Sequence, residues 1–495
     1  GYYRAADAYV SYSEHEGFGV PLLEAMAFDT PVIAYNTSAI SSTLGKAGLL
    51  LQSADPTELA SALRILFESP ERRRAVIRGQ RERLTEFSRA VVAEKFLSFI
   101  EPHLPRGVVP YRPQSAAVRS ASERTFVFEG PCETTYSLAL VNRNLAFGLD
   151  ARERTVAHLA PAEGVPGYEL KPEGLEAYPQ IEPLLEAPLL SARSTEVSIR
   201  NMYPLRPAGM LGDFRLSYFF WEESEIPSAL CALMNRYLDG IIAPTHFVQR
   251  LCRNSGVRIP IQVCGVGLDH RSVATDTPRP GTTRQFWFGH ISSGMARKGI
   301  EELITAYAIA FKAADDVELI IKSHHNVSNV VDAVVQRVIA GRANAPSIKI
   351  VYDDLDDENI EFFYDMIDAM VLPTRGEGYN LPAAEAMARG VPVLVTAYSG
   401  HMDFCNDDNA YLVDFRLESS SSHVNKEGAM WVRADVADLA VKMRLLFENN
   451  GDSMMSSKID AARRTVAPLT WAASAEKVEA FVDRLSEPRP QQRKI

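Results

Sequence analysis

The chain has 495 residues, of which 46% are apolar, and its formal net charge is −11. This length is enough for roughly three domains of about 150 residues. The acidic balance excludes a typical nucleic-acid binder, which presents a basic face, so no nucleic-acid partner is expected. Five scattered cysteines without a C-x-x-C pair argue against a disulfide framework or a structural zinc site, and they favour a reducing, cytoplasmic compartment.

Residues 1–100 have the pattern of the back half of an α/β domain. A strand, a helix, a second strand and a group of helices are expected over residues 8–12, 21–28, 31–35 and 56–100. Because this pattern opens inside a helix-and-strand unit at Gly1, we interpret it as a module that lacks its front in this chain. Residues 101–122 contain four prolines and little periodicity, which predicts a linker.

A second α/β domain is expected over residues 123–280. A strand at 124–128 leads into a helix that runs through Leu149. Further strands are expected at 196–199, 215–220, 240–243 and 259–265. The polar, proline-containing stretch 271–283 predicts a domain boundary.

The last domain is expected over residues 281–485, followed by a basic tail at 486–495. Its strands are expected at 285–289, 318–322, 348–352 and 369–373, and its main helices at 300–311 and 471–485. Alternating strands and helices predict parallel sheets of the doubly wound α/β type.

One short pattern occurs twice, as Glu16-Gly-Phe-Gly-Val-Pro-Leu-Leu-Glu24 and as Glu377-Gly-Tyr-Asn-Leu-Pro-Ala-Ala-Glu385. A shift of 361 residues also superimposes the flanking residues, for example Asp7-Ala8 on Asp368-Ala369 and Pro31-Val32 on Pro392-Val393. Self-similarity of this kind indicates duplication of a domain-sized unit.

The second copy predicts a site for a polyhydroxylated, phosphorylated ligand. Pro382 suits the first position of a helix and Gly390 suits a left-handed stop after it. Ligands bind beyond the carboxyl ends of the strands in such βαβ units. The N–H groups of Gly378, Tyr379, Asn380 and Leu381 would face that edge at a helix N-terminus, while Glu377 and Glu385 accept hydrogen bonds from sugar hydroxyls. An acid near a helix start can simply complement the dipole, but the repetition favours a ligand site.

Cationic and hydroxyl side chains are expected at the same edge. Arg297 and Lys298 precede Gly299 and a helix, which suits a diphosphate. Ser292 and Ser293 could add hydroxyl donors, and Lys322 ends the next strand.

These motifs resemble the family 4 retaining glycosyltransferases of the two-lobed GT-B architecture, whose signature is the Glu-x7-Glu loop. The resemblance implies a partial donor-binding lobe at 1–100, an acceptor lobe at 123–280 and a donor-binding lobe at 281–485. It further implies that Glu377 contacts the transferred sugar, that Glu385 holds the nucleotide ribose, and that Arg297 and Lys298 grip the diphosphate. Glu16 and Glu24 are the first-module equivalents.

The resemblance has one departure, because the family places an Arg where this chain has His290. The candidates for acceptor binding are inferred only from their positions relative to the predicted strands. In the first loop, Gly130, Glu133 and Thr134 are candidates for contact with the donor, and after later strands the polar residues Asn201, Glu222 and Glu223 could face the acceptor. His158 is interpreted as structural, and Trp221 as either core or cleft lip.

The sequence therefore predicts a retaining hexosyltransferase of cell-surface polysaccharide biosynthesis. It would use a nucleotide-diphosphate sugar, with GDP-mannose as the first candidate by analogy, and a glycan or lipid-linked glycan acceptor. Neither a metal nor a further cofactor is expected. Peripheral association with the inner face of the cell membrane is kept as an option. The alternatives are a nucleotide-sugar epimerase of the same architecture and a non-catalytic nucleotide- or glycan-binding scaffold. The first module is expected to be inert as it stands.

Overall fold

The structure is a computed structural model that describes residues 2–100, 124–160, 172–185, 195–271, 285–353, 355–422 and 428–487. The predicted linker at 101–122, nearly all of the predicted boundary at 271–283 and most of the tail lie outside these residues. Backbone contacts divide the chain into two compact units. One contains residues 1–130 and 150–215, and the other contains residues 131–149 and 216–495.

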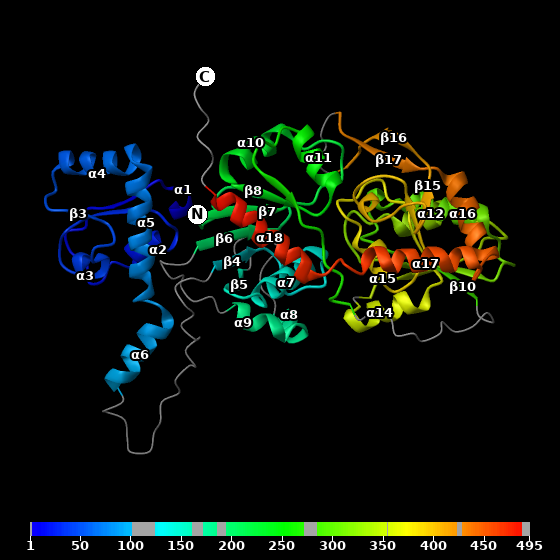
Figure 1. The fold of residues 1–495 in the computed structure, drawn as a ribbon, viewed down its shortest axis with the longest axis horizontal. Helices are drawn as coiled ribbons and strands as arrows, with labels where there is room; N and C mark the ends of the chain where they lie inside the picture. Colours follow the sequence, from blue (N-terminus) through cyan, green and yellow to red (C-terminus); the bar gives the residue numbers. More distant parts are fainter. Residues whose placement is uncertain are drawn as a thin grey trace, which may run out of the picture. The chain divides into compact units, whose positions relative to one another are not determined.

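The N-terminal part of the first unit is a small parallel sheet in the order β1-β2-β3 (Figure 1). Its strands are β1 (Tyr9–Ser11), β2 (Val32–Tyr35) and β3 (Leu49–Leu51). Successive side chains of a strand point to opposite faces. Accordingly, Val32 and Ala34 belong to one core cluster and Ile33 to another. The sheet is thus buried on both faces, as the doubly wound prediction requires.

Helices of the predicted group flank this sheet. They are α1 (Tyr2–Ala5), α2 (Val20–Ala27), α3 (Ile40–Leu44), α4 (Pro56–Glu68), α5 (Pro70–Thr85) and α6 (Arg89–Ile100). The start of α4 follows from its sequence, because the Asp55 side chain accepts a hydrogen bond from Thr57 N at 2.9 Å and Pro56 occupies the first turn.

The rest of the first unit contains a parallel set of strands in the order β5-β4-β6. They are β4 (Arg124–Glu129), β5 (Thr155–Ala160) and β6 (Thr195–Arg200), accompanied by α8 (Pro172–Ala177), a 3-10 turn (Pro179–Ile181) and α9 (Glu182–Leu185). The strands predicted at 124–128 and 196–199 are confirmed. The sequence analysis did not assign β5, on which His158 is buried.

The second unit begins with α7 (Ser137–Asp150) and a parallel set in the order β7-β8-β9. The elements of this part are β7 (Phe214–Tyr218), α10 (Ser228–Tyr237), β8 (Gly240–Ala243), α11 (His246–Asn254) and β9 (Ile261–Val263). The predicted acceptor lobe is thus divided between the two units, and its boundaries stay a prediction.

The larger sheet of the second unit is entirely parallel and runs in the order β12-β11-β10-β13-β14-β15. Its strands are β10 (Phe286–Ile291), β11 (Val317–Lys322), β12 (Ser347–Val351), β13 (Ala369–Leu372), β14 (Val393–Thr396) and β15 (Tyr411–Val413). The chain adds strands on one side of β10 and then continues on the other side with β13. The carboxyl ends of β10 and β13 are therefore the topological switch point, where ligands of such sheets bind.

Helices cover both faces of this sheet (Figure 1). They are α12 (Ile300–Ala310), α13 (Val331–Val338), α14 (Asp357–Met366), α15 (Leu381–Ala388), α16 (Val436–Glu448) and α17 (Ser453–Val466). Phe288, Leu319 and Leu394 form a core with α12 and α16. The C-terminal α18 (Trp471–Ser486) packs so closely against Gly267 that a Cβ there would lie 2.3 Å from Trp471 N.

One feature of this unit was not predicted. Between β15 and α16, the antiparallel strands β16 (Phe415–Ser419) and β17 (Met430–Ala434) form a two-stranded hairpin. Among the helices of the described residues, none has both the length and the apolar character needed to cross a bilayer.

Candidate functional site

The loop between β13 and α15 carries the second copy of the repeated pattern, and every residue from Val371 to Asn380 is buried. Asn380 adopts the left-handed conformation (φ 77°) before α15, and Gly390 does so after it (φ 69°), as predicted for Gly390. Pro382 is the second residue of the helix and not the first, because the helix already begins at Leu381.

The second copy's Glu377 is held in place through its backbone. Its N–H donates to Ser399 Oγ at 3.0 Å, and its carbonyl accepts from Gly400 N at 2.9 Å. A Cβ at position 400 would lie 2.3 Å from the carbonyl oxygen of Gly378, so this approach needs a glycine. The loop following β14 therefore fixes the direction of the Glu377 side chain.

Glu377 meets both predicted cations. Its carboxylate accepts from Lys298 Nζ at 2.7 Å and from Arg297 Nη1 at 3.2 Å. Arg297 and Lys298 lie in a 3-10 turn after β10 that ends at Gly299. Gly299 has φ 71°, and a Cβ there would lie 1.9 Å from Pro373 O. Only glycine allows this turn to lie so close to the end of β13. The turn thereby brings Arg297 and Lys298 to Glu377 at the switch point.

The cluster is electrostatically coupled. Burial acts to raise the pKa of Glu377, but the charges of Lys298 and Arg297 outweigh it and lower that pKa. Burial and the neighbouring Arg297 lower the pKa of Lys298. A second carboxylate, Glu222, lies 3.4 Å from Arg297 Nη2. Two cations thus face two carboxylates, and an incoming anion would compete with Glu222, the more exposed of the two.

Glu385 lies inside a separate hydrogen-bond group. It accepts from Tyr364 OH at 2.6 Å, His270 Nε2 at 2.9 Å and Arg271 Nε at 3.0 Å. Burial acts to raise the pKa of Glu385, but Arg271 and the hydrogen bonds outweigh it and bring the pKa to about 2. Three donors use most of the roughly four acceptor positions of a carboxylate. Little capacity remains for ribose, and that role stays a prediction.

The predicted cations Arg297 and Lys298 contact Glu377, but four other partners of the two glutamates were not predicted, namely Tyr364, Ser399, His270 and Arg271. A signal existed for two of them. The offset of 361 that relates the copies also places Tyr3 opposite Tyr364 and Ser38 opposite Ser399.

The remaining predicted donor residues lie at the carboxyl ends of β10 and β11. Ser292 Oγ accepts from Gly294 N at 3.1 Å and lies 2.8 Å from His290 Nε2, and Ser293 O accepts from Asn326 Nδ2 at 2.8 Å. Lys322 Nζ donates to Ser323 O at 2.7 Å. Burial lowers the pKa of His290 to about 4, so it does not supply the cation that the family has at this position.

Other predicted site residues form hydrogen bonds within the protein. Gly378 O accepts from Thr245 Oγ1 at 2.9 Å, and Tyr379 OH donates to Val266 O at 3.2 Å. Glu133 is buried, and its carboxylate accepts from the neighbouring backbone N–H of Cys132 at 3.0 Å. The carbonyl of Thr134 accepts from Arg143 at 2.7 Å.

The acceptor-side predictions diverge. Glu222 joins the cation cluster, whereas the buried Glu223 accepts a hydrogen bond from Ser422 Oγ. Trp221 is buried, which favours the core interpretation. Gly130 and Asn201 belong to the first unit, where Gly130 N donates to Ala160 O and Asn201 N donates to Glu129 O.

In the first copy, Glu16 N donates to Ser38 Oγ at 2.8 Å, and Glu24 accepts from Tyr3 OH at 2.8 Å. Glu24 is exposed, Glu16 is half-buried, and neither has an ion pair within the described part of the chain. Among the described residues, the first copy thus has the loop, and no Lys or Arg forms an ion pair with its glutamates.

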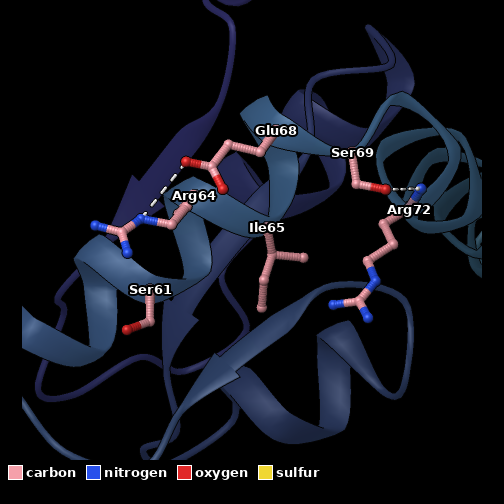
Figure 2. A pocket seen from close by; sticks show the side chains of 6 residues that line it. All are labelled: Ser61, Arg64, Ile65, Glu68, Ser69 and Arg72. Atoms are coloured by element: carbon pink, nitrogen blue, oxygen red, sulfur yellow. Dashed lines mark hydrogen bonds and ion pairs between the residues drawn. The ribbon is translucent and has the colours of Figure 1, made fainter.

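A shallow hollow of about 330 Å³ lies elsewhere, on the surface of the first unit (Figure 2). It is lined by residues of α4 and the start of α5, namely Ser61, Arg64, Ile65, Glu68, Ser69 and Arg72. None of these is a predicted site residue. In the described ranges, no group of three or more His, Cys, Asp or Glu side chains could hold a metal ion.

Two segments match known protein families. Residues 1–83 match the model described as "Glycosyl transferases group 1", and residues 245–478 match "Family 4 Glycosyltransferase in conflict systems". One relative is the capsular polysaccharide biosynthesis glycosyltransferase CapM of Staphylococcus aureus, 28% identical over 26% of this chain and 33% of CapM. This chain spans about a third or less of the length of the first curated relatives. The matches support a family 4-like glycosyltransferase.

Solved structures with a similar fold belong to GT-B glycosyltransferases. Sucrose-phosphate synthase from Thermosynechococcus elongatus superimposes with a TM-score of 0.53 at 14% identity, over 73% of this chain and 99% of that one. Anabaena HepE in complex with UDP-glucose gives 0.52 at 13% identity, over 73% and 100%. The predicted GT-B fold is thereby confirmed.

Proposed function

We propose that the second module, residues 123–485, transfers a hexose from a nucleotide-diphosphate sugar to a glycan or lipid-linked glycan, with retention at the anomeric carbon and without a metal. The observation that carries this proposal is the contact of Arg297 and Lys298 with the buried Glu377 at the switch point of the large sheet. Two cations beside a carboxylate match a ligand that is anionic at one end and hydroxylated at the other.

In the proposed reaction, the bond between the anomeric carbon and the diphosphate oxygen breaks while a bond to the acceptor oxygen forms. The acceptor proton passes to the leaving phosphate, so the protein needs no strong base. Arg297 and Lys298 stabilise the negative charge that develops on the diphosphate. Glu377 orients the sugar. Because Glu222 also contacts Arg297, it would have to release that side chain when the diphosphate enters.

The identities of donor and acceptor rest on the relatives. GDP-mannose is the first candidate by analogy with surface-polysaccharide enzymes, and the structure of HepE with UDP-glucose makes UDP-glucose the alternative. The name of CapM supports a polysaccharide acceptor. The description of the matched family 4 model instead points to conflict systems.

The test is a panel of nucleotide sugars. A bound donor should raise the melting temperature in proportion to its occupancy. The stabilising donor is then incubated with glycan and lipid-linked acceptors, and Glu377→Ala should abolish product formation while the fold persists. Donor turnover without an acceptor product would favour the epimerase or a hydrolase, and donor binding without turnover would favour the scaffold.

A further inference from the structure

The β16–β17 hairpin is an insertion that distinguishes the second copy from the first. Val413, at the end of β15, corresponds to Leu51 at the end of β3, an offset of 362. The next shared landmark is the aspartate that caps the following helix, Asp435 in the second copy and Asp55 in the first, an offset of 380. The second copy therefore contains 18 more residues between these landmarks, and β16 and β17 both lie in this longer segment.

The hairpin binds the segment that carries Glu222. The backbone N–H of Ser224 donates to Met430 O at 2.9 Å, and Met430 N donates back to Ser224 Oγ at 2.8 Å. Ser422, just beyond β16, donates to the buried Glu223. Two consecutive residues after Glu222 are thus fixed to the hairpin.

The same hairpin also binds the loop that carries Glu377. Val432 N donates to Arg375 O at 2.9 Å, and the ring of the buried Trp431 lies 5.2 Å from the Arg375 guanidinium carbon. The N–H of Arg375 in turn donates to Arg297 O at 2.8 Å. Strand β17 therefore contacts both the loop of Glu377 and the segment of Glu222. These two segments also meet each other directly, since a Cβ at Gly376 would lie 2.3 Å from Glu222 O.

A buried ion network holds this arrangement. Arg433 of β17 and Arg375 both contact Oε1 of the fully buried Glu302, each at 2.8 Å. A carboxylate shared by two guanidinium groups fixes both in position, since charge-assisted hydrogen bonds are strong and directional. Through Arg375, a displacement of β17 would be transmitted to both Arg297 and Glu377.

We propose that the β16–β17 hairpin is a positioning element that sets acceptor use. It holds the Glu222 segment against the loop of Glu377, so that the acceptor side and the donor cations keep one relative arrangement. This inference rests on the proposed transfer function for its effect on activity. The mechanical link between hairpin, Glu222 segment and Glu377 loop does not depend on that function.

The test is Ser224→Ala, which removes the acceptor of the Met430 N–H bond and leaves the cation cluster untouched. Ser419→Ala, on the exposed side of β16, is the matched control. In Ser224→Ala, hydrogen exchange should accelerate at residues 222–226 and 429–433 and also at 374–378. The kcat/KM for the acceptor should fall by about tenfold with an unchanged KM for the donor, because a small misplacement of reacting groups is costly. Ser224→Thr, which keeps the hydroxyl, should restore most of the activity.

The outcomes separate this inference from the proposed function. A wild-type chain that transfers no sugar contradicts the proposed function, while faster exchange at 374–378 in Ser224→Ala would still support the link. Exchange that changes only at the substituted contact, or transfer equal to wild type in Ser224→Ala, would overturn the positioning role. Equal losses for donor and acceptor together with a lower melting temperature would also overturn it, because they indicate general destabilisation.

Discussion

The two copies of the Glu-x7-Glu loop have the same backbone and different surroundings. Glu16 N donates to Ser38 Oγ as Glu377 N donates to Ser399 Oγ, at 2.8 and 3.0 Å. Tyr3 and Tyr364 donate to the second glutamate of their copies at 2.8 and 2.6 Å. Gly19 and Asn380 both precede the helix in a left-handed conformation. The geometry of the loop therefore depends on contacts within a segment of about 40 residues in each copy.

The charged partners of the glutamates in the second copy, by contrast, come from distant parts of the chain. Lys298 and Arg297 follow β10, about 80 residues before Glu377, and His270 and Arg271 lie still farther from Glu385. Within the described ranges, no Lys, Arg or His contacts Glu16 or Glu24. The same loop is thus half-exposed in one copy and a charged, buried site in the other.

The largest effect is expected when the first glutamate of each copy is neutralised. Glu377→Gln should lower the transfer rate by about 100-fold or more, in the range seen when one preorganised electrostatic group is removed. Glu16→Gln should change the rate by less than about twofold, because no cation of the described residues contacts Glu16. Initial rates with labelled donor measure both. Equal losses in the two variants would show that the first copy also takes part.

A smaller effect is expected from the tyrosines that contact the second glutamates. Tyr364→Phe removes a buried hydrogen bond to a carboxylate, worth about 1.5–3 kcal/mol, and should lower the free energy of unfolding by that order. Tyr3→Phe removes the same bond at an exposed site and should cost well under about 1 kcal/mol. Urea unfolding of both variants checks this. Similar losses would contradict the claim that surroundings, and not loop geometry, separate the copies.

A further effect concerns the acid stability of the second copy. Burial lowers the pKa of His290 from 6.5 to about 4, so the unfolded chain binds this proton more tightly than the folded one. Stability should fall as the pH decreases from 6.5 toward 4, by at most about 3 kcal/mol from this residue. Glu385, whose pKa is lowered to about 2, adds a second loss as the pH falls from 4.5.

Unfolding free energies measured at several pH values between 7 and 2 test this expectation. His290→Asn should flatten the profile between pH 6.5 and 4 and leave the step of Glu385 in place. An unchanged slope would mean that His290 does not remain neutral in the folded chain.

The sequence predicted the parts of the site that are local. The loop of Glu377, the left-handed Gly390 and the strands that end at the switch point follow from patterns a few residues long. The presence of two cations, Arg297 and Lys298, at this edge could be predicted because both directly precede Gly299 and the following helix. The partners of Glu385 could not, because His270 and Arg271 come from a segment without a motif of its own.

The hairpin was missed for a different reason. Phe415-Arg-Leu-Glu-Ser419 alternates apolar and polar residues as an exposed strand does, but no strand was predicted there. The change of offset from 362 to 380 is defined by the strand ends and helix caps of the structure. The pairing of Glu222 with Arg297 also needed the fold, since 75 residues separate them.

The account depends most on the binding of the donor diphosphate by the cation cluster. Calorimetric titration of GDP and UDP into the wild-type chain, Lys298→Met and the exposed control Lys312→Met measures this directly. We expect Lys298→Met to weaken nucleotide binding by about tenfold or more, in line with the loss of a charge-assisted contact, and Lys312→Met to leave it unchanged. Equal affinities in all three proteins would contradict the placement of the donor beside Glu377.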